Sequence, residues 1–94
     1  MKILALEKDI PSARATPLDL KAEAARVWEL YRSGIIREIY FRADRHQAVL
    51  LLECSDVATA SGILDSLPLV QKKLVAFDLI PLLPYSGWER LFSI

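Results

Sequence analysis

The chain has 94 residues, which is the size of one domain, and we expect residues 1–94 to form a single domain. Hydrophobic residues make up 53% of it, more than an average soluble domain carries. This excess predicts a core that is shared between copies of the chain. Twelve basic and twelve acidic residues cancel, so the composition favours neither a nucleic-acid partner nor an anionic membrane surface.

No segment has the pattern of a membrane anchor or a secretion signal. The longest apolar runs, Ala48–Leu52 and Leu79–Leu83, are far shorter than the roughly 20 residues of a membrane-spanning helix. The apolar start of the chain is interrupted at Glu7, too early for a signal peptide. The single cysteine, Cys54, cannot form a disulfide within the chain, and we expect it in the core. The sequence therefore predicts a cytoplasmic protein.

The first elements are a strand and a helix. Lys2–Lys8 is short and apolar enough for a strand. Thr16 can cap a helix that begins at Pro17, and Gly34 can end it in a left-handed conformation. The helix carries one apolar stripe, which we expect to face the core: Leu20, Ala24, Val27, Trp28 and Tyr31.

A β-hairpin follows the helix. Ile35–Ala43 alternates in polarity, and Gln47–Cys54 returns after a short polar turn. Strict alternation places Arg37 on one face with Ile35, Ile39 and Phe41, where we expect it to be buried. The same alternation places Glu38 and Tyr40 on the opposite face.

The last third of the chain predicts a helix, a strand and an apolar tail. Ser55 or Asp56 can cap the helix, and Pro68 ends it. Lys73–Ile80 is the fourth strand, closed by Pro81 and Pro84. Four large apolar side chains lie within residues 85–92. This tail either reaches a neighbouring copy or folds onto its own helices; both remain open.

The order of elements, βαββαβ, predicts a ferredoxin-like α+β fold: a four-stranded antiparallel sheet with two helices on one face. The strands carry apolar residues on both faces, so the second face of the sheet must also be covered. We therefore expect two copies to pack sheet against sheet, as a dimeric α+β barrel.

The sequence contains no metal-binding motif, phosphate-binding loop or nucleophile elbow, and we expect no metal and no cofactor. Catalysis would then depend on acid–base groups. Charges set within apolar strands are the informative ones, because burial shifts their pKa values. We interpret Glu7 and Arg42 as surface charges at strand ends or as members of structural ion pairs. The candidate catalytic residues are Glu38, Glu53 and His46, and the candidate substrate-binding residues are Arg37, Tyr40 and Trp88. For each, packing, pairing or solvation is the competing interpretation.

The entry into the second strand, Gly34-Ile35-Ile36-Arg37, together with Leu67-Pro68-Leu69 before a strand that carries Asp78, resembles the muconolactone isomerase-like family. The resemblance covers roughly residues 20–84. It implies that the chain forms the face-to-face homodimer of the dimeric α+β barrel superfamily, or a higher homo-oligomer. It also implies proton transfer on a small organic acid or lactone, with Arg37 holding a substrate carboxylate.

Three functions remain open at this point. The first is a small-molecule-binding barrel, with isomerase activity on a small carboxylated or lactone substrate. The second is a non-enzymatic dimerisation or regulatory module that acts through its tail. The third is a cofactor-free oxygenase or a haem-degrading barrel, against which the position of His46 in a turn argues.

Overall fold

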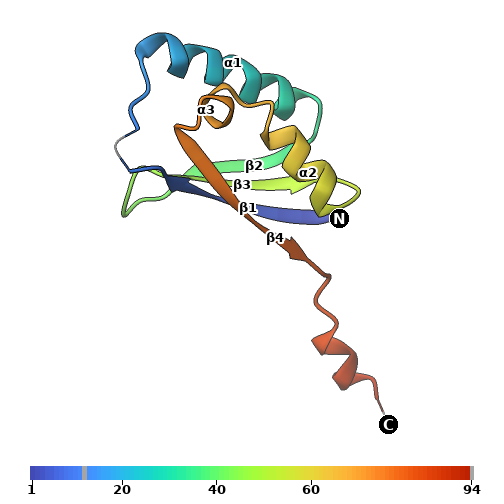
Figure 1. The fold of residues 1–94 in the computed structure, drawn as a ribbon. Helices are drawn as coiled ribbons and strands as arrows, with labels where there is room; N and C mark the ends of the chain where they lie inside the picture. Colours follow the sequence, from blue (N-terminus) through green and yellow to red (C-terminus); the bar gives the residue numbers. More distant parts are fainter. Residues whose placement is uncertain (12, 94) are drawn as a thin grey trace.

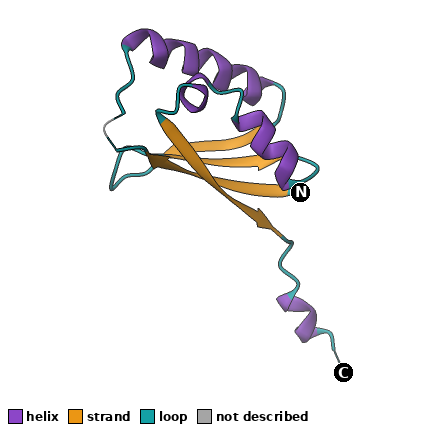
Figure 2. Ribbon diagram, in the orientation of Figure 1, coloured by secondary structure: helices purple, strands orange, loops and turns teal. Residues whose placement is uncertain are grey.

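The computed structural model describes residues 1–11 and 13–93. A four-stranded antiparallel sheet, in the order β2-β3-β1-β4, carries a layer of helices on one face (Figures 1 and 2). The predicted ferredoxin-like α+β fold is confirmed. In chain order the elements are β1 (Lys2–Asp9), α1 (Pro17–Arg32), β2 (Ile36–Phe41), β3 (Ala48–Glu53), α2 (Val57–Leu64), α3 (Pro68–Gln71), β4 (Val75–Leu82) and a 3₁₀ helix (Gly87–Leu91).

Local signals set both ends of α1, as the sequence predicts. The N–H of Asp19 donates to Thr16 Oγ1 at 3.1 Å, and the N–H of Thr16 donates to Asp19 Oδ2 at 2.8 Å. This capping box satisfies two N–H groups that have no partner within the helix. Gly34 follows the last turn with φ +85°, a left-handed conformation that disfavours any residue with a Cβ.

The face of α1 that meets the sheet differs from the predicted stripe. Trp28 and Tyr31 are 58% and 48% exposed, and Leu20 is also exposed, so their predicted burial is wrong. Trp28 and Tyr31 instead stack on each other, with ring centroids 6.0 Å apart. The core receives Leu30.

Polar contacts join α1 to the region around α3. Asp19 is buried and pairs with the ammonium group of Lys72, just after α3. Glu23, one turn further along, accepts a hydrogen bond from the backbone of Leu69 in α3. These bonds hold α1 against the region around α3, while Trp28 and Tyr31 lie on the exposed side of the helix.

A β-bulge in β2 changes the predicted orientation of Arg37. Ile36 pairs with Leu52 but Glu38 already pairs with Leu51, so Arg37 is the additional residue between them. Arg37 is exposed and Ile36 is buried, which makes the expected burial of Arg37 wrong. Beyond the bulge the alternation resumes, and the predicted separation of Ile39 from Tyr40 onto opposite faces holds.

Two prolines do not end elements as the sequence predicts. Pro68 begins α3, because α2 already ends at Leu64. Pro81 lies inside β4, where it pairs with Ile3 and the strand continues to Leu82. The sheet tolerates this proline because β4 is an edge strand. The other predicted strands begin and end within one or two residues of the observed ones.

The core lies between the sheet and the helices. It is formed by side chains from one face of β1 and β3, from Ile36, and from the helices, and includes Ile3, Ala5, Leu50, Leu52, Cys54, Ala60, Leu64 and Leu67. The burial of Cys54 confirms its predicted position in the core.

The other face of the sheet is apolar and has no helix over it (Figure 1). Register places its central side chains next to one another across β1, β3 and β4: Leu4, Leu6, Val49, Leu51 and Ile80. We call these five residues the open face. Charged side chains flank it at both ends: Lys2 pairs with Glu53 at 2.8 Å and Lys8 with Asp78 at 2.9 Å.

The tail after β4 leads away from the body of the protomer (Figure 1). Tyr85 and Trp88 pack edge to face, with ring centroids 5.1 Å apart, and the tyrosine ring lies directly over Gly87. Leu91 and Phe92 are each 80% exposed. Of the two predicted courses for the tail, folding back onto its own helices is therefore wrong for this protomer.

Candidate functional site

A cavity of about 620 Å³ lies between the helix layer and the sheet. Its lining comes from the end of β1, the β2–β3 hairpin, the start of β4, the segment between β1 and α1, and the facing sides of α1 and α3. Most of the lining is apolar and includes Val27, Ile39, Leu50, Leu69 and Phe77. This volume and composition are typical of sites that take a small organic molecule.

Glu7 lies on the sheet wall of the cavity. Ile3, Ala5 and Glu7 share one face of β1, so the face that enters the core ends in a half-buried carboxyl. Glu7 Oε1 accepts a hydrogen bond of 3.3 Å from the N–H of Ala48. Burial raises the pKa of Glu7 and the nearby Asp9 carboxyl adds to the increase, whereas the Ala48 N–H opposes it.

Glu23 lies on the helix wall of the same cavity. Its Oε1 accepts a hydrogen bond of 3.0 Å from the N–H of Leu69. Burial raises the pKa of Glu23, and this hydrogen bond only partly offsets the effect. The two glutamates therefore approach the cavity from different layers, and neither forms an ion pair within residues 1–11 and 13–93.

The hairpin brings His46 to the edge of the cavity. The imidazole stacks on the Phe41 ring, with centroids 4.2 Å apart and an interplanar angle of 25°. Asp9 lines the same edge and accepts a hydrogen bond of 3.3 Å from the Gln47 amide. His46, Phe41 and Asp9 are exposed as well as cavity-lining, so they mark its opening to solvent.

This arrangement can move a proton on a bound molecule. A carboxyl group whose pKa is raised toward neutrality can accept a proton from a carbon acid and later return it. Burial raises the pKa of Glu7, and its carboxyl lies in a largely apolar lining, so Glu7 is the candidate for this role.

The structure separates the residues predicted for the site. Of the six predicted catalytic and substrate-binding residues, one, His46, is among the residues that line the cavity. Arg37 is exposed in the bulge of β2. The hydroxyl of Tyr40 donates to Glu38 Oε1 at 2.7 Å, which raises the pKa of the tyrosine, and both side chains are exposed on the side of the sheet away from the helices.

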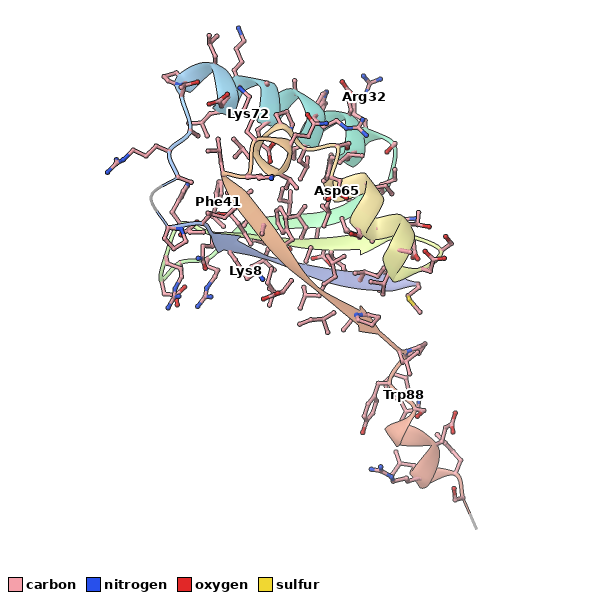
Figure 3. The ribbon with its side chains drawn as sticks, viewed as in Figure 1. Lys8, Arg32, Phe41, Asp65, Lys72 and Trp88 are labelled. Atoms are coloured by element: carbon pink, nitrogen blue, oxygen red, sulfur yellow. The ribbon has the colours of Figure 1, made fainter. Side chains whose placement is uncertain are left out.

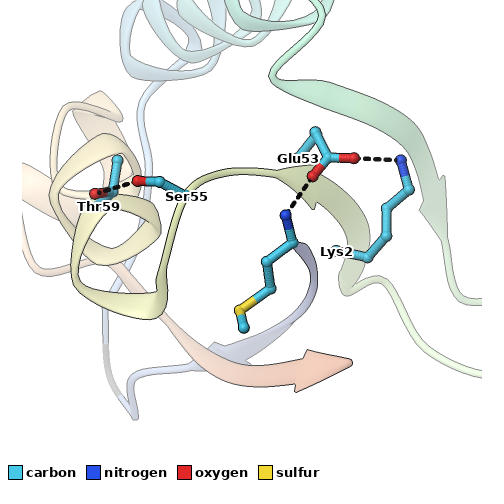
Figure 4. A network of polar contacts seen from close by, with 5 residues as sticks. Lys2, Glu53, Ser55 and Thr59 are labelled. Carbon is cyan, nitrogen blue, oxygen red and sulfur yellow. Dashed lines mark hydrogen bonds and ion pairs between the residues drawn. The ribbon is translucent and has the colours of Figure 1, made fainter. Parts of the chain in front are cut away.

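Glu53 and Trp88 also lie away from the cavity. The Glu53 carboxylate accepts from the N-terminal ammonium at 2.6 Å and from Lys2 Nζ at 2.8 Å (Figure 4). The hydrogen bonds from Lys2 and the N-terminus lower the pKa of Glu53 to about 2. Trp88 lies in the tail, away from the sheet and the helices (Figure 3).

Sequence reasoning missed Glu7 and Glu23. Interpreting Glu7 as a surface charge is wrong, and the signal that could have identified it is period two, because Ile3, Ala5 and Glu7 share a face. For Glu23 the signal is the helical period, because Leu20, Glu23, Val27 and Leu30 follow one another at spacings of three, four and three along α1. Arg42, in contrast, pairs with Asp44 at 2.6 Å on the surface, as predicted.

The described residues contain neither a group of metal ligands nor a membrane-spanning helix. Among residues 1–11 and 13–93, no three histidine, cysteine or acidic side chains are grouped so as to hold a metal ion. Within the same residues, no helix combines the length and the apolar character needed to cross a membrane.

Comparisons with known proteins support the fold. No protein-family model matches the sequence, and no curated protein matches it. Among solved structures, the chain is similar to 5-chloro-2-hydroxyhydroquinone dehydrochlorinase (TftG) from Burkholderia phenoliruptrix AC1100, in complex with 2,5-dihydroxybenzoquinone. The TM-score is 0.64 at 15% identity, over 93% of this chain and 98% of the other. At this identity the likeness shows a shared α+β fold.

Proposed function

We propose that the protein binds a small ring molecule in the cavity between helices and sheet and transfers a proton on it, with Glu7 as the acid–base group. The observation that carries this proposal is the half-buried Glu7 carboxyl within a largely apolar cavity. His46, at the opening, is placed to contact a substrate as it enters. The solved relative, a dehydrochlorinase that holds a dihydroxybenzoquinone, supports a ring of similar size.

Within this proposal, isomerisation of a lactone is the reaction that fits best. Moving a double bond next to a carbonyl needs one group that removes a proton and returns it at a second carbon. Glu7 can perform both steps, because its carboxylate can take the proton and its carboxyl form can return it. A carboxylated substrate is less well supported, because Arg37, its expected anchor, is exposed outside the cavity lining.

Hydrogen–deuterium exchange on a bound ligand tests this proposal. We expect the protein to incorporate deuterium from D₂O next to the carbonyl of an unsaturated lactone, and Glu7→Gln to lower this rate by about 100-fold or more, the usual contribution of a general base. Mass spectrometry of the lactone measures the exchange. Glu38→Gln, the same change outside the cavity, is the matched control.

Two outcomes would contradict the proposal. Equal rates in the wild type and Glu7→Gln would remove Glu7 from the reaction. Equal loss in Glu7→Gln and Glu38→Gln would show that the change does not act through the cavity.

We also propose that the protein works as a homodimer packed through the open face. Leaving Leu4, Leu6, Val49, Leu51 and Ile80 in water costs free energy that a second copy recovers. The flanking charges are of both signs, Lys2 and Lys8 against Glu53 and Asp78, so the same surface on two copies can be complementary.

The exposed tail favours a second function, a non-enzymatic dimerisation or regulatory module. The tail leads away from the body of the protomer (Figure 1), and Leu91 and Phe92 are each 80% exposed, which suits a segment that binds a partner. The exchange experiment separates the two functions, because a purely regulatory module has no rate for Glu7→Gln to change.

A further inference from the structure

The cavity is lined by more acidic than basic side chains. Three acidic residues, Glu7, Asp9 and Glu23, line it. No lysine or arginine of the described chain is among its lining residues, and its one histidine lies at the opening. Several carboxylates elsewhere in the protomer are paired with a cation, namely Asp19 with Lys72, Asp44 with Arg42 and Glu53 with Lys2.

The two glutamates are also incompletely bonded for groups of their kind. A carboxylate has about four acceptor positions. In the described chain Glu7 accepts one long backbone hydrogen bond and Glu23 accepts one of ordinary length, both on Oε1. Both carboxyls are half-buried beside apolar neighbours, where a charged partner interacts with them more strongly than it would in bulk water.

The chemistry of a suitable ligand follows from these walls. An apolar ring would contact the aliphatic and aromatic lining, such as Val27, Leu50 and Phe77. An ammonium group on that ring would donate hydrogen bonds to the free glutamate oxygens and neutralise their charge. A carboxylate on the same ring would meet like charge and acceptors that offer it no hydrogen.

We propose that the cavity takes a small apolar ring that carries a cationic amine and rejects the same ring when it carries a carboxylate. This inference rests on the proposed small-molecule cavity and gives its charge preference. Because Glu7 and Glu23 come from opposite walls, removing either side chain's charge should reduce the preference.

Three probes that differ only in the charged group test the inference: benzylamine, benzyl alcohol and phenylacetate, titrated at pH 7 into the full chain. Amide shifts in ¹H–¹⁵N spectra report affinity and position. We expect benzylamine to bind at least about tenfold more tightly than phenylacetate, with benzyl alcohol between them, and to shift the amides of Ala48 and Leu69.

Variants then assign the preference to the cavity. Glu7→Gln and Glu23→Gln should each lower the ratio of benzylamine to phenylacetate affinity by about threefold or more and leave benzyl alcohol binding nearly unchanged. Glu29→Gln is the matched control, because Glu29 lies on α1 with Glu23 but pairs with Arg26 on the surface. It should leave the ratio as in the wild type.

The possible failures are distinguishable. Phenylacetate binding in the cavity as tightly as benzylamine would overturn the charge preference and leave the proposed cavity function standing. Binding of none of the three probes, or shifts only outside the cavity, would overturn both. A preference for benzylamine that Glu29→Gln lowers as much as Glu23→Gln would show a general charge effect and overturn the assignment to these walls.

Discussion

Asp19 is the buried charged side chain among the described residues. It is buried, forms the capping box with Thr16 and pairs with Lys72. The hydrogen bond from Lys72, followed by those from Thr16, lowers the pKa of Asp19 from 3.8 to about 2. Asp19 therefore connects the start of α1 to the segment after α3. Both α1 and α3 contribute to the helix wall of the cavity.

This lowered pKa predicts how stability depends on pH. A carboxyl with a lower pKa in the folded state stabilises that state above its unfolded pKa, and the contribution disappears as the pH falls from about 4 to about 2. Asp19→Asn should therefore lower the melting temperature at pH 6, with a difference from the wild type that shrinks across this interval.

Thermal melts between pH 2 and pH 7 measure the effect. Asp65→Asn, which changes an exposed aspartate at the end of α2, is the control and should stay close to the wild type throughout. A gap between wild type and Asp19→Asn that is as wide at pH 2 as at pH 6 would contradict the assignment.

At the level of elements, two glycines play opposite parts. Gly34 ends α1 at φ +85°, whereas Gly62 lies inside α2, and an added Cβ meets no atom within 4 Å at either position. The two positions therefore have the same room for a side chain and differ in backbone conformation. An L-residue is strained at the first position and is a better helix former than glycine at the second.

Alanine at each glycine should shift stability in opposite directions. We expect Gly34→Ala to lower the free energy of unfolding by about 1 kcal/mol and Gly62→Ala to raise it by about 0.5–1 kcal/mol. Urea denaturation followed by circular dichroism measures both. Two changes of the same sign would show that packing, and not the backbone, decides at one of the sites.

The elements also show what a single sequence can and cannot predict. Thr16, Pro17 and Gly34 predict α1 correctly because capping depends on residues that are neighbours in sequence. The face that α1 buries is harder to predict, because Trp28 and Tyr31 extend the apolar stripe beyond the residues that pack on the core. The contact of Glu23 with Leu69, 46 residues away, cannot be read from a local pattern. The bulge at Arg37 is equally hidden, since Ile35–Phe41 alternates as a regular strand would.

The candidate site follows the same division. His46 is identified from the sequence because it is the single histidine, the side chain suited to acid–base chemistry near neutral pH. The turn that carries it does border the cavity. Glu7 is predictable in principle from strand period. The cavity itself arises from how α1 and α3 sit over the sheet, and that arrangement appears only in the folded chain.

For the whole molecule, the open face decides the state of assembly. We expect the full chain to behave in solution as a particle of at least twice the 10.6 kDa of one protomer. Leu51→Asp, at the centre of that face, should convert it to a monomer or weaken association by about 100-fold, because a carboxylate would be buried between the sheets.

Light scattering across a dilution series measures the mass, and circular dichroism checks that the variant folds. Ser61→Asp, on the exposed side of α2, is the control and should assemble normally. A wild type that stays at 10.6 kDa at micromolar concentration would contradict the dimer.

Pro81 gives this sheet two unequal borders. Proline has no N–H to offer a further strand, so the border formed by β4 is a poor template for cross-β growth. The border at β2 contains no proline. The β4 edge is therefore protected against addition of a strand from another copy, whereas the β2 edge lacks this protection. Variants designed to prevent aggregation would be placed within residues 36–41.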